Sequence, residues 1–174
     1  MAKIGVIIGR FQPFHEGHAY LVQCAIDANM DKVLFLCGSS NRARSFKNPW
    51  YFQERSQMIG DFMKSQHPNV AFECLDLFDF YYREDLWIKQ VQNKIAQASN
   101  PEDSIHVIAH DKDDSSYYVY LFPQWKLELF KHYQKLDATH VRANYFAAKP
   151  WQAHLHQTTI TFLESFKNHK AYTR

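Results

Sequence analysis

Lys3-Ile4-Gly5-Val6-Ile7-Ile8-Gly9 opens the chain as a short apolar run that ends at a glycine. A run this rich in β-branched residues indicates a strand buried on both faces, which is typical of a parallel sheet. Residues 32–37 repeat the pattern and also stop at a glycine, Gly38. Because parallel strands need crossover connections, usually helices, the two runs predict an α/β fold with a mostly parallel sheet.

The remainder of the chain alternates strands with helices, as this fold class requires. Apolar spacing predicts helices over residues 18–29, 52–65, 84–98, 139–148 and 158–170, and further strands over 70–75, 105–109 and 126–130. No repeat, low-complexity tract or linker interrupts the 174 residues. We therefore expect a single domain, 1–174, with a C-terminal helix at about 158–170.

Composition excludes several classes of protein. The 20 Lys and Arg against 18 Asp and Glu leave a net charge of +2, which is not typical of a nucleic-acid binder. The sequence has neither an apolar run of membrane-spanning length nor a secretory leader, so we expect no membrane partner. Three cysteines without CxxC spacing favour neither disulfides nor a zinc site. These features predict a cytoplasmic protein.

The stretch Gly9-Arg10-Phe11-Gln12-Pro13-Phe14-His15-Glu16-Gly17-His18 lies where the first strand gives way to the first helix. Ligands of open α/β sheets bind at the carboxyl ends of strands, and a helix N-terminus favours phosphate. His15 and His18 are three residues apart, so in the first helical turn they would share a face. The simpler alternative is that the two histidines only begin a helix. Because the pair has no evident third ligand, it does not indicate zinc.

Two other segments suggest phosphate contacts. In Leu136-Asp137-Ala138-Thr139-His140-Val141-Arg142, Thr139 is a plausible N-cap and Arg142 lies one turn into the helix. A hydroxyl, free N–H groups and a guanidinium suit a polyphosphate, although a capped helix with a solvated arginine is the simpler alternative. Arg42 and Arg44 follow the second strand, where a solvated basic loop is the alternative. Trp87, near a helix start, is either a core residue or a stacking surface.

The ten-residue stretch resembles the signature of the HxGH nucleotidylyltransferases. Its GRFQPFH form is similar to nicotinamide mononucleotide adenylyltransferases of the archaeal and bifunctional bacterial type. Residues 136–142 resemble a second signature, ISxTxxR, with Leu136 and Asp137 replacing Ile and Ser. Residues 109–125 resemble the bifunctional branch, in which such enzymes are fused to a Nudix hydrolase. Because the sequence stops at Arg174, we expect no Nudix domain on this chain.

The resemblance implies a Rossmann-like parallel sheet of about five strands and transfer of AMP from ATP to nicotinamide mononucleotide, giving NAD and pyrophosphate. It implies that Mg²⁺ is held by ATP phosphates rather than by the protein, and that the chain forms a homo-oligomer. The implied catalytic residues are His15, His18 and Arg142. The implied ATP-binding residues are Gly9, Arg10, Phe11, His15, His18, Thr139 and Arg142. The implied substrate-binding residues are Arg42, Arg44 and Trp87.

Two alternatives stay open at this point. The same fold could serve another phosphate acceptor, such as phosphopantetheine, FMN or glycerol phosphate. Alternatively, the chain could be a non-catalytic sensor of NAD or ATP, an option that the acidic Asp137 keeps open. A turnover assay separates catalysis from sensing, and a panel of acceptors separates the two enzymatic readings.

Overall fold

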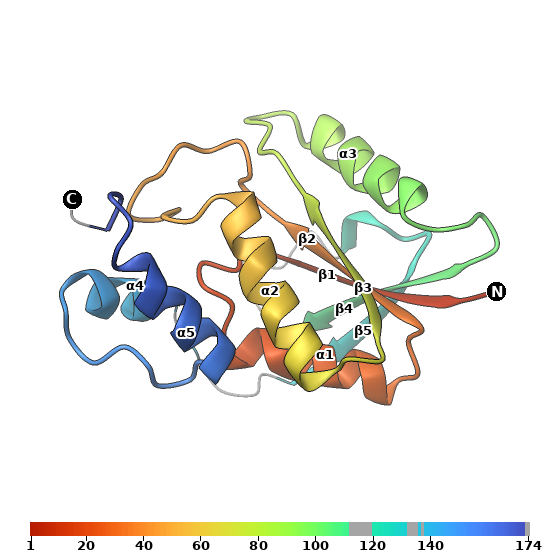
Figure 1. The fold of residues 1–174 in the computed structure, drawn as a ribbon. Helices are drawn as coiled ribbons and strands as arrows, with labels where there is room; N and C mark the ends of the chain where they lie inside the picture. The colour runs from red at the N-terminus through yellow and green to blue at the C-terminus, as the bar shows by residue number, and fades with distance from the viewer. Residues whose placement is uncertain (112–119, 132–135, 137, 173–174) are drawn as a thin grey trace.

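The structure, a computed structural model, describes residues 1–111, 120–131, 136 and 138–172. A five-stranded sheet runs in the order β3-β2-β1-β4-β5, and every neighbouring pair is parallel (Figure 1). The strands are β1 (Lys3–Gly9), β2 (Lys32–Cys37), β3 (Ala71–Asp76), β4 (Ser104–His110) and β5 (Lys126–Phe130). The predicted α/β fold is therefore confirmed, as is the parallel sheet of about five strands.

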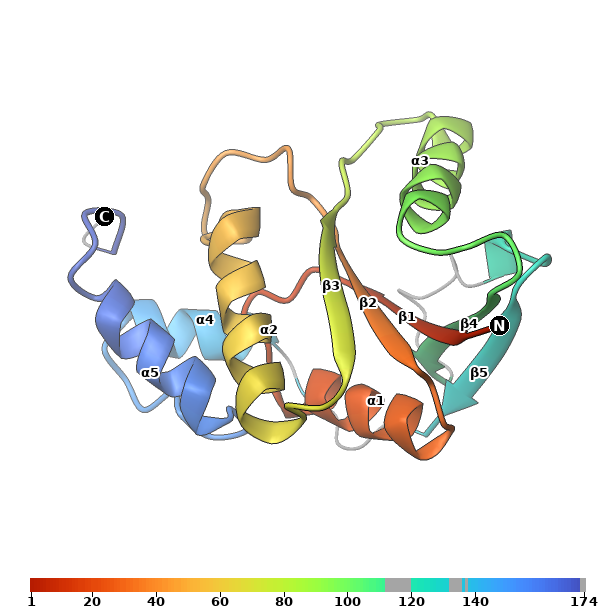
Figure 2. The ribbon, with the colours of Figure 1, turned by 45° about the vertical axis from the view of Figure 1, so that its right-hand side comes forward.

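Helices cover both faces of this sheet (Figure 2). The helices are α1 (Glu16–Asp27), α2 (Phe52–Gln66), α3 (Glu84–Gln97), α4 (Ala138–Phe146) and α5 (Gln157–Phe166). α1 and α2 lie on one face and α3 on the other, while α4 and α5 lie beyond α2 (Figures 1 and 2). No helix in the described part of the chain is both long enough and apolar enough to cross a membrane.

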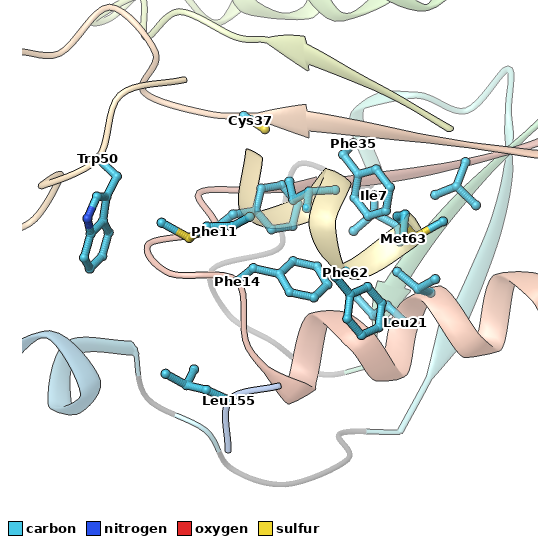
Figure 3. Close-up of a cluster of buried hydrophobic side chains, with 14 of the residues drawn as sticks. Ile7, Phe11, Phe14, Leu21, Phe35, Cys37, Trp50, Phe62, Met63 and Leu155 are labelled. Atoms are coloured by element: carbon cyan, nitrogen blue, oxygen red, sulfur yellow. The ribbon is translucent and has the colours of Figure 1, made fainter. Parts of the chain in front are cut away.

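The core explains why the central strands are apolar throughout. Ile7 and Phe35 pack in the cluster under α1 and α2, whereas Val6 and Leu34 pack in the cluster under α3. Since successive strand residues point to opposite faces, both faces must be apolar. The loop after β1 contributes to the first cluster through Phe11 and Phe14, whose rings point into it (Figure 3). Burial of these two rings anchors the loop that carries the histidines.

Several helix boundaries differ from the sequence prediction by one to four residues, and three of the differences bear on the site or the end of the chain. α1 begins at Glu16, two residues before the predicted start, because His15 caps it. α4 begins at Ala138, so Thr139 lies in its first turn instead of at the N-cap. α5 ends at Phe166 rather than at 170, because residues 167–172 form successive i→i−3 turns. There the hydroxyl of Tyr172 donates to the backbone oxygen of Tyr145, which ties the end of the chain to α4.

Candidate active site

A cleft opens where β1 and β4 separate. β1 pairs with β2 as far as Gly9↔Cys37, but its pairing with β4 ends at Val6↔Val107. Both strands continue, to Gly9 and His110. The cleft at these carboxyl ends has a volume of about 420 Å³. It lies where the strand order reverses, the place at which open α/β sheets bind ligands.

The cleft brings together some of the predicted site residues and adds others. Four predicted residues line it: Gly9, Arg10, His18 and Trp87. Sequence reasoning assigned no role to three further lining residues: Ser39, Asp79 and His110. Each of these three lies at or after the end of a strand. Their positions could have been found from the strand ends, but not their contacts, which depend on loop conformation.

His15 and His18 form a reciprocal cap at the start of α1. The Gly17 N–H donates to Nδ1 of His15 at 3.0 Å, and the His15 N–H donates to Nδ1 of His18 at 3.1 Å. The two rings stack with centroids 3.8 Å apart. Because each Nδ1 accepts a hydrogen bond, a neutral ring carries its proton on Nε2. The expected helix-start pair therefore exists, with His15 at the N-cap, and both rings hold a defined donor.

The electrostatic surroundings keep both rings neutral. Burial, followed by the proximity of His110 and His154, lowers the pKa of His15 to about 4. Burial, followed by the proximity of His15 and His110, holds the pKa of His18 well below its usual range. Charging either imidazole would place a cation in a poorly solvated site beside other basic groups. Near neutral pH the unliganded pair therefore consists of neutral Nε2–H donors.

Two neighbours fix the position of these rings. Gly17 is required beside His15, because a Cβ at position 17 would lie 2.8 Å from Cε1 of that ring. Phe11, at a φ of 52°, is 1% exposed and packs its ring against His18 with centroids 4.6 Å apart. The Phe11 side chain thus supports the site from beneath rather than facing the cleft.

Buried polar contacts join the loops around the cleft. Arg55, which is fully buried on α2, donates to the backbone oxygens of Arg10 and Gly38, each at 2.7 Å. It also donates to Oγ of Ser40 at 3.0 Å. Gln12 pairs through its side-chain amide with the backbone N–H and oxygen of Trp50. The sequence shows Arg55 only as one of several basic residues, so its role as a clamp was not predicted.

Arg10 is the cationic residue that lines the cleft, and it also reaches across to the loop before α2. Its guanidinium donates to Oδ1 of Asn48 at 3.0 Å and to the backbone oxygen of Lys47. Burial lowers the pKa of Arg10, partly offset by Asp79, but an arginine stays charged at neutral pH. Arg10 therefore brings a positive charge to the cleft from a tethered position.

Arg142 and Thr139 come together beside the loop after β1, outside the cleft lining. Arg142 is 4% exposed and donates to the backbone oxygen of Gln12 at 2.8 Å and to Oγ1 of Thr139 at 3.3 Å. Its guanidinium is committed to holding the histidine loop. Thr139 remains exposed on the first turn of α4. Asp137, the departure from the family pattern, lies outside the described residues.

The two candidate loop arginines have different surroundings. Arg44 makes a bidentate pair with Glu54 at 2.6 and 2.9 Å and lies over the Tyr51 ring. Arg42 instead donates to Oδ2 of Asp79 at 2.9 Å, as does the Ser39 hydroxyl. Arg44 therefore fixes its own loop to α2, whereas Arg42 contacts a residue that lines the cleft.

Two further lining residues come from α3 and the segment before it: Trp87 lies in the first turn of α3, and Asp79 lies on the segment that leads into it. Trp87 is half-buried and its ring packs on Phe122 with centroids 6.0 Å apart. The side-chain amide of Asn41 pairs with both backbone polar groups of Asp79, at 2.9 and 3.2 Å. The amide of Gln90 pairs in the same way with Phe78. These contacts preorganise one wall of the cleft.

A family model for cytidylyltransferase-like proteins matches residues 6–152, which include the whole cleft. The chain belongs to the cytidylyltransferase-like family. A nicotinamide/nicotinic acid mononucleotide adenylyltransferase of Acinetobacter baylyi is 32% identical to it over 169 residues, covering 96% of this chain and 88% of the relative. A nicotinamide-nucleotide adenylyltransferase of Pyrococcus horikoshii is 22% identical, covering 94% and 83%.

Solved structures agree with this cytidylyltransferase-like assignment. A bifunctional NMN adenylyltransferase/ADP ribose pyrophosphatase from Francisella tularensis, complexed with AMP and a manganese ion, superposes with a TM-score of 0.85 at 29% identity. The match covers 99% of this chain and 51% of that one, so the chain spans about half the length of the Francisella protein. The resemblance inferred from the GRFQPFH stretch is confirmed.

Proposed function

We propose that this protein transfers the adenylyl group of ATP to nicotinamide mononucleotide, giving NAD and pyrophosphate. The observation that carries the proposal is the stacked pair His15 and His18, which places fixed Nε2–H donors at the N-terminus of α1 beside the opening between β1 and β4. Helix N-termini and neutral imidazole donors suit phosphoryl oxygens. The family relatives named above supply the nucleotide class.

The chemistry needs positioning more than proton transfer. An oxygen of the acceptor's 5′-phosphate forms a bond to the α-phosphorus of ATP, and the bond to the β-phosphate oxygen breaks as pyrophosphate leaves. A phosphate monoester has a second pKa of about 6 and is already largely ionised at pH 7, so no protein base is required. The protein's task is to align the two phosphates and to offset the growing charge.

Each side chain has a proposed part in this task. His18, on the cleft wall, donates to the α-phosphate, while His15 supports the β-phosphate side and Arg10 approaches the triphosphate. Arg142 positions the loop through the Gln12 carbonyl, and Thr139, which is exposed in the first turn of α4, would meet the β- and γ-phosphates.

At the proposed acceptor end, Trp87 lines the cleft and Arg42 contacts the lining residue Asp79. The indole of Trp87 offers a face to the cationic pyridinium ring, a contact worth roughly 2 kcal/mol when desolvated. Arg42 is the better placed of the two loop arginines to approach the acceptor phosphate, because it contacts a residue of the cleft. Magnesium is proposed to enter with ATP, and its charge would assist departure of pyrophosphate.

The test measures pyrophosphate release from MgATP by the purified protein with nicotinamide mononucleotide, nicotinic acid mononucleotide, phosphopantetheine, FMN or no acceptor. We expect release with the first, and NAD as product. Release only with phosphopantetheine or FMN would keep the nucleotidyl-transfer chemistry but change the acceptor. ATP or NAD binding without any release would identify a sensor and overturn the proposal.

A further inference from the structure

His110 ends β4 and lines the same cleft as His18, yet neither the histidine signature nor the second phosphate motif includes it. Its ring lies parallel to that of Tyr20 on α1, with centroids 6.2 Å apart, so it faces the α1 side of the sheet. His18 stands on this helix two residues before Tyr20. Because the side chains of His18 and Tyr20 leave the helix in different directions, it is the shared lining of the cleft that brings His110 into the region of His18.

The position of His110 follows from the sheet itself. β1 and β4 are paired only as far as Val6↔Val107, and the last three residues of each strand border the opening. Gly9 ends the first strand and His110 ends the second. A phosphoryl group seated in this opening would have the β1 loop on one side and the end of β4 on the other.

The charged and titratable groups around His110 favour an anion in the opening rather than a cation. A charge on His110 acts on both His15 and His18, which places the three imidazoles within electrostatic range of one another. Arg10 also lines the cleft. The acidic residue that lines it, Asp79, accepts hydrogen bonds from Arg42 and Ser39. Donors that are positively charged, or become so on protonation, favour binding of an anion in the opening on which they converge.

We propose that His110 is a third catalytic histidine, which hydrogen-bonds to the transferred phosphoryl group from the end of β4, in addition to His18. The inference rests on the proposed adenylyl transfer. Donors from two elements would orient the phosphoryl group for in-line attack and would stabilise the charge that builds on its nonbridging oxygens, while the bond to the acceptor oxygen forms and the bond to the pyrophosphate oxygen breaks. The alternative is that His110 only forms the wall against Tyr20.

The test compares His110→Ala and His110→Gln with the wild type, with His154→Gln as the matched control. His154 also lies near His15 but does not line the cleft. We expect His110→Ala to lower kcat at least 10-fold while KM for nicotinamide mononucleotide stays within 2-fold. His110→Gln, which keeps an N–H donor, should retain more activity than the alanine variant, and His154→Gln should stay within 2-fold of the wild type.

Binding of MgATP, measured by calorimetry, separates this inference from the proposed function. If the wild type turns over and both His110 variants keep its kcat, the role of His110 is overturned while the proposed reaction stands. A rise in KM for the mononucleotide as large as the fall in kcat would also overturn that role. Wild-type binding of MgATP without turnover would overturn the proposed reaction, and weaker binding by His110→Ala would then still support the phosphate contact. If the alanine variant does not fold, His110→Asn takes its place in the comparison with His110→Gln, because the asparagine amide is too short to reach the phosphoryl group.

Discussion

At the scale of single residues, the chemistry of the cleft depends on which imidazole nitrogen carries the proton. Backbone N–H groups occupy Nδ1 of both His15 and His18, so neither ring has to reorganise before Nε2–H meets a phosphate. Donors fixed in this way contribute most when charge develops in the transition state. The sequence predicted the pair and its place at a helix start, but not the mutual capping, which requires His15 to lie outside the helix.

His18→Ala should lower kcat by about 100-fold or more with a much smaller change in KM for ATP, because the lost donor acts mainly in the transition state. Steady-state kinetics with MgATP and nicotinamide mononucleotide measure both constants. His67→Ala, which alters a histidine at the end of α2, is the control and should behave like the wild type. Near-normal kcat in His18→Ala would remove His18 from the transition state.

The depressed pKa of His15 predicts how stability changes with pH. The folded-state pKa of about 4 lies below the value of about 6.5 in the unfolded chain, so the unfolded chain binds the proton preferentially. This contribution is complete above pH 6.5 and is lost as the pH falls toward 4, with a maximum on the order of 3 kcal/mol. Urea unfolding at pH 7, 5.5 and 4.5 should therefore show a smaller loss of stability for His15→Gln than for the wild type. Equal losses would contradict the assignment.

At the scale of elements, two helical glycines give opposite expectations for the same substitution. Gly17→Ala should lower kcat because the new Cβ displaces the His15 ring, which lies 2.8 Å away. Gly60→Ala on α2 meets no atom closer than 3.9 Å and should raise the free energy of unfolding by roughly 0.5–1 kcal/mol, with activity unchanged. Kinetics and urea unfolding of both variants test the pair. Similar behaviour of the two would count against the crowding at His15.

α2 holds the loops after β1 and β2 through one buried guanidinium. Arg55→Met should lower the free energy of unfolding by roughly 2–4 kcal/mol, because the Arg10 and Gly38 carbonyls lose a charged donor in a buried site. Activity should fall as well, since these residues border the cleft. Arg83→Met, which removes a largely exposed arginine paired with Asp85, should leave the free energy of unfolding close to that of the wild type. Urea unfolding measures both, and an equally small effect at Arg55 would show that the clamp is dispensable.

Elements were more predictable than their ends. The apolar runs at Lys3–Gly9 and Lys32–Cys37 specify buried strands because both faces of the sheet are covered, and the structure places them centrally. Helix ends depend on capping by side chains that have several possible roles. His15 caps α1 and Tyr172 fixes the turns after α5, contacts that a one-dimensional pattern does not contain.

At the scale of the whole molecule, the position of the cleft was predictable but its composition was not. The ends of the strands and the stretch from Gly9 to His18 indicate where a ligand binds. The pairing of Arg42 with Asp79, and of Arg44 with Glu54, depends on how separate loops meet in space. Sequence reasoning therefore left the two arginines equivalent, whereas the structure separates them by their carboxylate partners.

The cleft draws on strands from the middle of the sheet and on α1, so a ligand bound there should stabilise the fold as a unit. NAD at about 100 times its Kd adds about 2.7 kcal/mol by mass action, which corresponds to a rise in Tm of roughly 5–10 °C for a chain of this size. Thermal unfolding followed by circular dichroism, with and without NAD, measures the shift. Glucose 6-phosphate is the control, and an unchanged Tm at high NAD concentration would argue against binding in the cleft.

His15 both caps α1 and supplies an imidazole to the proposed site, and this has a consequence for how the sequence can evolve. Serine, an ordinary cap residue, at position 15 would keep α1 intact yet remove the imidazole, whereas a bulky residue at position 17 would keep the imidazole but push it aside. A substitution at either position therefore lowers turnover even where the helix still forms. A lineage that gave up catalysis but kept nucleotide binding would be recognised by substitution at these two positions first, while the aromatic residues beneath them stayed unchanged.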